Sequence, residues 1–179
     1  VIAEGNSLYE VCDKLVKAQH PEISPVDDHM GIMFPPRPAA NGKGVRVSLF
    51  VSGCNHHCKG CFNAQAWDFN YGKDFTEKEI DKIIEELDHP YVAGLSLLGG
   101  EPLEYQNQKG ILPLVKKIKE KLPNKNIWCY TGYKFDEDVE GNMFENWPET
   151  KELMKYIDVV VDGKFEEEVE NEIKEQFKI

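Results

Sequence analysis

The sequence lacks any apolar run long enough to cross a membrane. A spanning helix needs about 20 consecutive apolar residues, and charged side chains interrupt every candidate stretch. The first fifteen residues, VIAEGNSLYEVCDKL, carry acidic side chains where a secretory signal has a basic start and an apolar run. We therefore expect a cytoplasmic protein with no membrane partner.

Basic residues are also scarce. The chain has 21 Lys and Arg against 32 Asp and Glu, which gives a formal net charge of −11. Nucleic-acid-binding proteins present a basic footprint that neutralises phosphates, and the sequence shows none. No nucleic-acid partner is therefore expected.

Cysteines are few, and their odd number argues against a disulfide framework. Three of the five form the pattern Cys54-x3-Cys58-x2-Cys61. Three thiolates on one short loop can converge on a soft metal centre, whereas a structural zinc site usually has four closed ligands. Three thiolates suit an iron–sulfur cubane that keeps one iron open. Cys12 and Cys129 fall in predicted regular structure, as buried small hydrophobes do.

Two histidines leave an alternative open. His56 and His57 lie inside the cysteine loop and could complete a Cys₂His₂ or Cys₃His zinc site, so a non-enzymatic zinc-binding interaction module is the alternative from another class. We expect both side chains to face solvent or a partner instead. The loop's Asn55 and Lys59 make it too polar for a core.

Strand and helix patterns alternate along the chain after a preceding arm. Residues 1–43 are predicted to form a helix at 7–18 and an arm rich in Pro and Gly, and residues 44–179 a single domain. Strands are expected at 45–51, 95–98, 127–130 and 157–161, and helices after a Thr76/Glu79 capping box and at 112–122 and 149–156. This order predicts an α/β fold with a mostly parallel sheet. Ligands then bind at the carboxyl ends of the strands.

Four segments in this order and spacing resemble one family. They are VRVSLFVSGCNHHCKGCFN, LSLLGGEPL, IWCYTGYKF and DVVVDGKF, and the resemblance covers about residues 41–165. The cysteine motif resembles the radical S-adenosylmethionine (SAM) superfamily. The four segments together resemble the activating proteins of anaerobic (class III) ribonucleoside-triphosphate reductases. The glycyl-radical activase of pyruvate formate-lyase is the alternative enzyme; it shares the cysteine spacing but not the TGYKF and VVVDGKF pair.

The resemblance implies a fold, cofactors and a reaction. The fold would be a small partial (βα) barrel of the radical SAM type. Cys54, Cys58 and Cys61 would hold a [4Fe–4S] cluster that cleaves SAM reductively, and a glycyl radical would form on the reductase. The electron donor would be reduced flavodoxin or ferredoxin. No catalytic side chain is implied, because cluster and SAM carry the chemistry. The expected SAM-binding residues are Gly60, Cys61, Phe62, Gly99, Gly100, Glu101 and Thr131.

The chain also departs from these relatives. Many superfamily members have an aromatic residue before the third cysteine, but here Gly60 precedes it and Phe62 follows, as in the activating proteins. The first ~40 residues differ from the family's short lead-in. The chain closes on KFEEEVENEIKEQFKI instead of an Arg-Gly-Ser-Ser-Asn-Gln-like segment. Either it is truncated or a helix at 166–178 replaces that segment.

Overall fold

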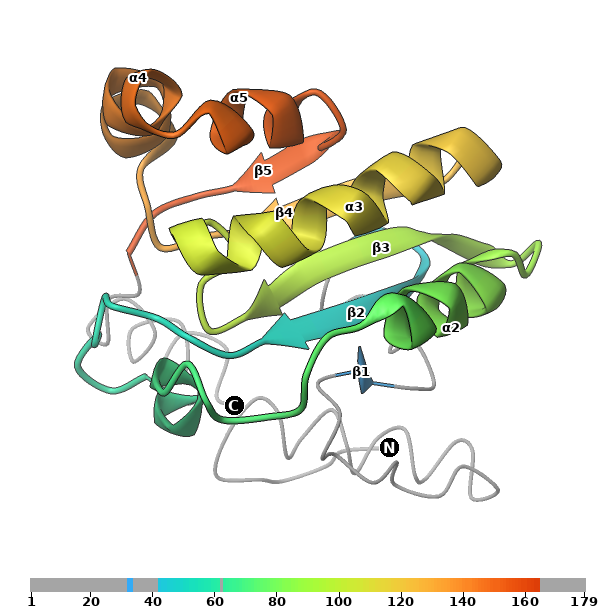
Figure 1. Ribbon diagram of the computed structural model, residues 1–179, viewed down its shortest axis with the longest axis horizontal. Coiled ribbons are helices and arrows are strands. Elements are labelled where there is room, and N and C mark those ends of the chain that lie inside the picture. The colour runs from blue at the N-terminus through green and yellow to red at the C-terminus, as the bar shows by residue number, and fades with distance from the viewer. Residues whose placement is uncertain (1–31, 34–41, 62, 165–179) are drawn as a thin grey trace, which may run out of the picture.

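A computed structural model describes residues 32–33, 42–61 and 63–164 of the chain. They form a five-stranded sheet with the strands in chain order (Figure 1). Strand β1 (Ile32–Met33) is antiparallel to β2, and the other strands are mutually parallel, namely β2 (Val45–Val51), β3 (Val92–Gly99), β4 (Asn126–Tyr130) and β5 (Val159–Val161). The α/β class and the mostly parallel sheet are confirmed. The helices expected at 7–18 and 166–178, Cys12 and Phe62 lie outside the described residues.

Helices connect consecutive parallel strands. Helix α2 (Glu77–Leu87) joins β2 to β3, and α3 (Tyr105–Lys121) joins β3 to β4. Three short helices lie between β4 and β5: the π-helix η3 (Phe135–Met143), α4 (Phe144–Asn146) and α5 (Pro148–Met154). A 3₁₀ helix, η2 (Ala64–Trp67), follows the cysteines.

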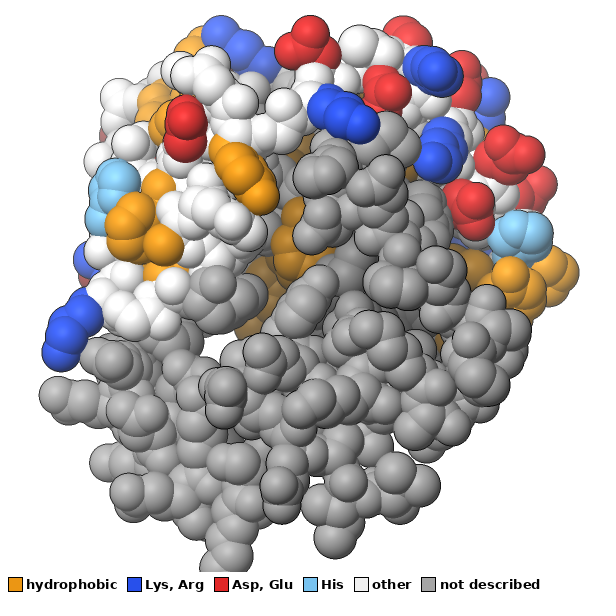
Figure 2. All heavy atoms as spheres, turned by 90° about the horizontal axis from the view of Figure 1, so that it is seen from below, with side chains coloured by type: hydrophobic (Ala, Val, Ile, Leu, Met, Phe, Trp, Pro, Cys, Tyr) orange, Lys and Arg blue, Asp and Glu red, His pale blue; other side chains and the backbone are white. Residues whose placement is uncertain are grey.

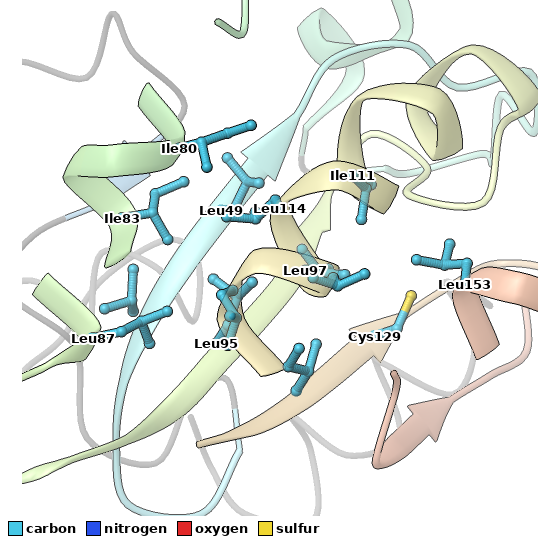
Figure 3. Close-up of a cluster of buried hydrophobic side chains, with 14 of the residues drawn as sticks. Leu49, Ile80, Ile83, Leu87, Leu95, Leu97, Ile111, Leu114, Cys129 and Leu153 are labelled. Carbon is cyan, nitrogen blue, oxygen red and sulfur yellow. The ribbon is translucent and has the colours of Figure 1, made fainter. Parts of the chain in front are cut away.

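The core lies between the helices and one face of the sheet. Alternate strand residues point to this face and meet apolar side chains of α2, α3 and α5 (Figure 3). These strand residues include Val47, Leu49, Leu95, Leu97, Ile127 and Cys129. Cys129 is fully buried, as predicted. Since α2, α3 and α5 all bury residues in this one cluster, they cover the same face of the sheet.

The opposite face carries buried polar residues near the amino ends of the strands. The Arg46 guanidinium donates to Ser96 Oγ at 2.7 Å, to the Leu95 carbonyl at 2.6 Å and to Asn126 Oδ1 at 2.6 Å, and it lies over the Trp128 ring. Burial lowers the pKa of Arg46. One cation thus connects three adjacent strands, because each partner lies on β3 or β4.

A local sequence signal explains where α2 begins. The capping box is present: Thr76 Oγ1 accepts from the Lys78 amide and the Glu79 carboxylate accepts from the Thr76 amide. Helix α3 begins seven residues earlier than expected. The prediction started too late because Gly110 and Pro113 interrupt the apolar pattern of the first turns. The π-helix η3 was not predicted.

No described helix is long and apolar enough to cross a membrane. On the described part of the face in Figure 2, acidic and basic side chains are interspersed, without a continuous basic patch.

Candidate metal centre

The carboxyl ends of three parallel strands meet at one edge of the sheet. Strand β2 leads into the cysteine loop (54–61), β3 ends at Gly99, and β4 ends before Thr131; the strand arrows in Figure 1 point to this edge. Backbone hydrogen bonds connect the first two segments: Gly100 N donates to Val51 O at 2.7 Å and Glu101 N donates to Gly53 O at 2.9 Å. The cysteine loop, the Gly99–Gly100 turn and the segment that begins at Thr131 therefore meet at the carboxyl ends of the strands, where the site was expected.

The base of the cysteine loop is fixed by the segment that follows it. Gly53 N donates to Ala66 O at 2.8 Å, and Cys54 N donates to Trp67 O at 3.2 Å, so η2 closes the loop. Gly60 has a φ of 78° and His57 a φ of 47°, left-handed conformations that turn the chain sharply. These bonds and turns define the path of the loop.

All three loop thiols are free. Cys54 is buried, whereas Cys58 and Cys61 are half-buried. Burial raises the pKa of the Cys54 thiol, and the nearby Glu101 carboxylate adds to the rise.

The chemistry of the donor set suits an iron–sulfur cluster, since three thiols lie on one short loop. A zinc ion needs its ligands around one atom, whereas in a cubane each thiolate binds a different iron. His56, which could have completed a zinc site, is hydrogen-bonded to Glu101 instead.

The two glycines after β3 let backbone segments touch. A Cβ at Gly99, whose φ is 115°, would lie 2.6 Å from the backbone N and O of Val51. A Cβ at Gly100 would lie 2.6 Å from Gly53 O, directly before Cys54. The glycines were expected to allow a close approach of the backbone. In the structure, the backbone of this turn closely approaches the backbone at the base of the cysteine loop.

Glu101 is the polar centre of this edge. Its side chain is 1% exposed, and its carboxylate accepts four hydrogen bonds. The donors are Leu103 N, Thr131 Oγ1 and Gly132 N, each at 2.8 Å, and His56 Nε2 at 3.0 Å. The structure therefore brings together two predicted site residues, Glu101 and Thr131, and shows that each binds the other.

A second buried carboxylate lies beside it. Glu104 Oε1 accepts from Asn55 N at 3.0 Å and from the Tyr133 hydroxyl at 3.3 Å. Burial, reinforced by Glu104, raises the pKa of Tyr133 well above its usual range. Glu104 was not among the predicted site residues, although its position three residues after Glu101, beyond the end of β3, was a signal in the sequence.

The expectation that His56 faces solvent or a partner is wrong. Its side chain is 10% exposed, and its ring packs edge-on against Tyr133 with centroids 4.3 Å apart. Gly132 makes the space, since a Cβ there would lie 2.8 Å from the ring. His57 is exposed, as expected, with its ring against Trp67.

These features define a small parallel α/β protein with a three-thiol metal loop, and comparison with known proteins identifies it more closely. The model of a 4Fe-4S single cluster domain matches residues 40–178, so the metal group is an iron–sulfur cluster. The anaerobic ribonucleoside-triphosphate reductase-activating protein of Enterobacteria phage T4 is 43% identical over 126 residues, 70% of this chain and 74% of the relative. The protein of the same name from Pasteurella multocida is 38% identical over 139 residues, 76% and 84% of the two chains. That from Escherichia coli K12 is 42% identical over 133 residues, 73% and 81%.

The chain belongs to the family of anaerobic ribonucleoside-triphosphate reductase-activating proteins. This confirms the family resemblance that the four segments indicated. Neither the pyruvate formate-lyase type of activase nor a zinc module is favoured. No solved structure gives a significant match.

Proposed function

We propose that this chain is a radical SAM activase that generates a glycyl radical on an anaerobic ribonucleoside-triphosphate reductase. The observation that carries the proposal is the three-thiol loop at the carboxyl edge of a parallel sheet. It occurs in a chain whose relatives, matched over most of their length, are named as activating proteins of that reductase. An oxidoreductase of this kind needs a ligated cluster, bound SAM and a protein partner.

Cys54, Cys58 and Cys61 would hold a [4Fe–4S] cluster by three thiolates and leave its fourth iron for SAM. When bound, the cluster would supply the electron for reductive cleavage of SAM, the chemistry by which a hydrogen atom could be removed from a glycine of the reductase. The half-buried Cys58 and Cys61 would leave a bound cluster accessible to both SAM and the partner. Nothing in this scheme requires an acid or base from the chain.

The SAM site would extend along the same strand ends. The Gly99–Gly100 turn presents backbone next to the cysteine loop, where its carbonyl groups would accept from the methionine ammonium of SAM. Gly60 and Cys61 would line the adenosine side, and Phe62, also predicted to contact SAM, lies outside the described residues. The sequential strand order with helices on one face is compatible with a partial (βα) barrel, whose other face would enclose SAM.

The partner would approach the outer side of the loop. Asn55, His57, Lys59 and Gly60 are exposed there, and polar groups around a half-open site suit a protein contact. Reduced flavodoxin or ferredoxin would deliver the electron at the same edge.

The proposal is tested with the reconstituted protein and an anaerobic ribonucleoside-triphosphate reductase. Under strict anaerobiosis, with SAM and a chemical reductant, the mixture should form 5′-deoxyadenosine and then reduce a ribonucleoside triphosphate. Omitting SAM or this chain should abolish both. Formation of 5′-deoxyadenosine without any gain in reductase activity would reject the partner while keeping the SAM chemistry.

A further inference from the structure

The carboxylate of Glu101 has no acceptor position left for a ligand. An ionised carboxylate offers about four lone-pair sites, and Glu101 fills them with four protein donors. Oε1 accepts from Leu103 N and Thr131 Oγ1, and Oε2 accepts from Gly132 N and His56 Nε2. The side chain therefore cannot also bind the ammonium of SAM without losing one of these bonds.

These four donors come from three segments that are distant in sequence. Leu103 follows β3, Thr131 and Gly132 follow β4, and His56 lies within the cysteine loop, 45 residues before Glu101. Glu101 consequently ties the loop to the two neighbouring strand ends. The His56 ring is additionally held between Gly132, which has no side chain to obstruct it, and Tyr133.

The attachment points lie between two cysteines. His56 binds Glu101, and the preceding Asn55 amide donates to Glu104 at 3.0 Å. Both residues belong to the stretch that separates Cys54 from Cys58. By contrast, the exposed His57 packs against Trp67. Two buried carboxylates thus determine the path of the chain between the first and second thiols.

We propose that Glu101, acting through His56, is a positioning residue that holds the Cys54–Cys58 segment in its cluster-binding shape. This inference rests on the proposed function only in that the loop must ligate a cluster. Loss of a hydrogen bond to a charged group should lower the equilibrium constant for forming the cluster-binding shape by roughly tenfold or more.

The experiment compares matched ring substitutions at adjacent positions. His56→Phe keeps a ring against Tyr133 but removes the donor to Glu101. His57→Phe makes the same change at a ring that is hydrogen-bonded to no carboxylate among the described residues. After anaerobic reconstitution, we expect a chelator to extract iron from His56→Phe about tenfold faster than from wild type, and from His57→Phe at the wild-type rate. His56→Gln, whose amide can donate to Glu101, should recover most of the retention, which a merely space-filling role would not predict.

A second variant tests the same contact without changing the loop, in case His56→Phe itself disturbs folding. Gly132→Ala leaves the loop sequence intact but places a methyl group 2.8 Å from the His56 ring, so it should also accelerate iron extraction. Equal extraction from His56→Phe, Gly132→Ala and His57→Phe would overturn the inference while the proposed function stands. If the wild-type chain takes up no iron, the proposed function itself fails.

Discussion

At the scale of single residues, the site depends on side chains with sharply different surroundings. Cys54 is buried beside two carboxylates, while Cys58 and Cys61 remain half-exposed. Glu101 is buried and fully hydrogen-bonded. The cysteine spacing could be interpreted from the sequence because all three ligands lie on one loop. The contact between His56 and Glu101 could not, since it depends on how two strand ends meet.

Single replacement of a loop cysteine should abolish stable cluster binding. The Cys58→Ala protein loses one of three thiolates, and no other cysteine lies in the described part of the loop to replace it. We expect iron content to fall to background in an anaerobic iron assay. Cys129→Ala is the control: this thiol is buried in the core, so the variant should keep its iron although it loses about 1–2 kcal/mol of stability. Normal iron in Cys58→Ala would refute the ligand assignment.

Gly100 should tolerate no side chain. A methyl group there would press on Gly53 O, so Gly100→Ala should displace the base of the cysteine loop and reduce both cluster retention and SAM binding. Iron content and SAM titration of the reconstituted variant measure the two effects. Gly110→Ala is the matched control. Among the described residues, a methyl group at this position in α3 meets only Phe75, at 3.7 Å, so the substitution should raise the unfolding free energy by about 0.5–1 kcal/mol. Wild-type iron retention by Gly100→Ala would contradict this explanation.

At the scale of secondary-structure elements, the sequence predicted those with strong local signals. Strand β2 matches the expected bounds, and the capping box starts α2 where predicted. The start of α3 was misjudged because a helix interior with Gly110 and Pro113 is stabilised by packing, which local pattern does not report. The π-helix η3 has no sequence signature of comparable strength.

Arg46 should contribute strongly to the free energy of unfolding, because it connects three strands of the sheet. Its guanidinium donates to acceptors on β3 and β4, and Arg46→Met would remove these three hydrogen bonds. We expect the apoprotein to lose roughly 2–4 kcal/mol of unfolding free energy in chemical denaturation. Lys116→Met removes an exposed cation from α3 that pairs with Glu152; its effect should stay within about 1 kcal/mol. Equal stability of the two variants would show that the Arg46 network is dispensable.

At the scale of the whole molecule, the fold places three strand ends at one edge and covers one face with helices. The order of strands and helices predicted this edge as the site, because parallel strands share their direction. The contacts within it are long-range: Asn55 and Glu104 are 49 residues apart, and Thr131 and Glu101 are 30 apart. Residues so far apart in the sequence meet only in the assembled sheet, so local sequence patterns do not predict these contacts.

The half-open site should make the cluster sensitive to air. Because Cys58 and Cys61 are half-exposed, oxygen can reach a bound cluster, and we expect its broad absorbance near about 400 nm to bleach within hours of aeration with loss of iron. An anaerobic sample kept in parallel should retain both. Full metal occupancy after aeration would point to redox-inert zinc instead of a cluster.

The central claim is that this chain creates a radical on a glycine of its partner. It is tested most directly by electron paramagnetic resonance of the reconstituted protein mixed with an anaerobic ribonucleoside-triphosphate reductase, SAM and a reductant. The account predicts a doublet from a glycyl radical coupled to its α-hydrogen. This doublet should be absent when the acceptor glycine is replaced by alanine or when Cys58→Ala is used. A wild-type mixture that cleaves SAM but gives no doublet would contradict the account.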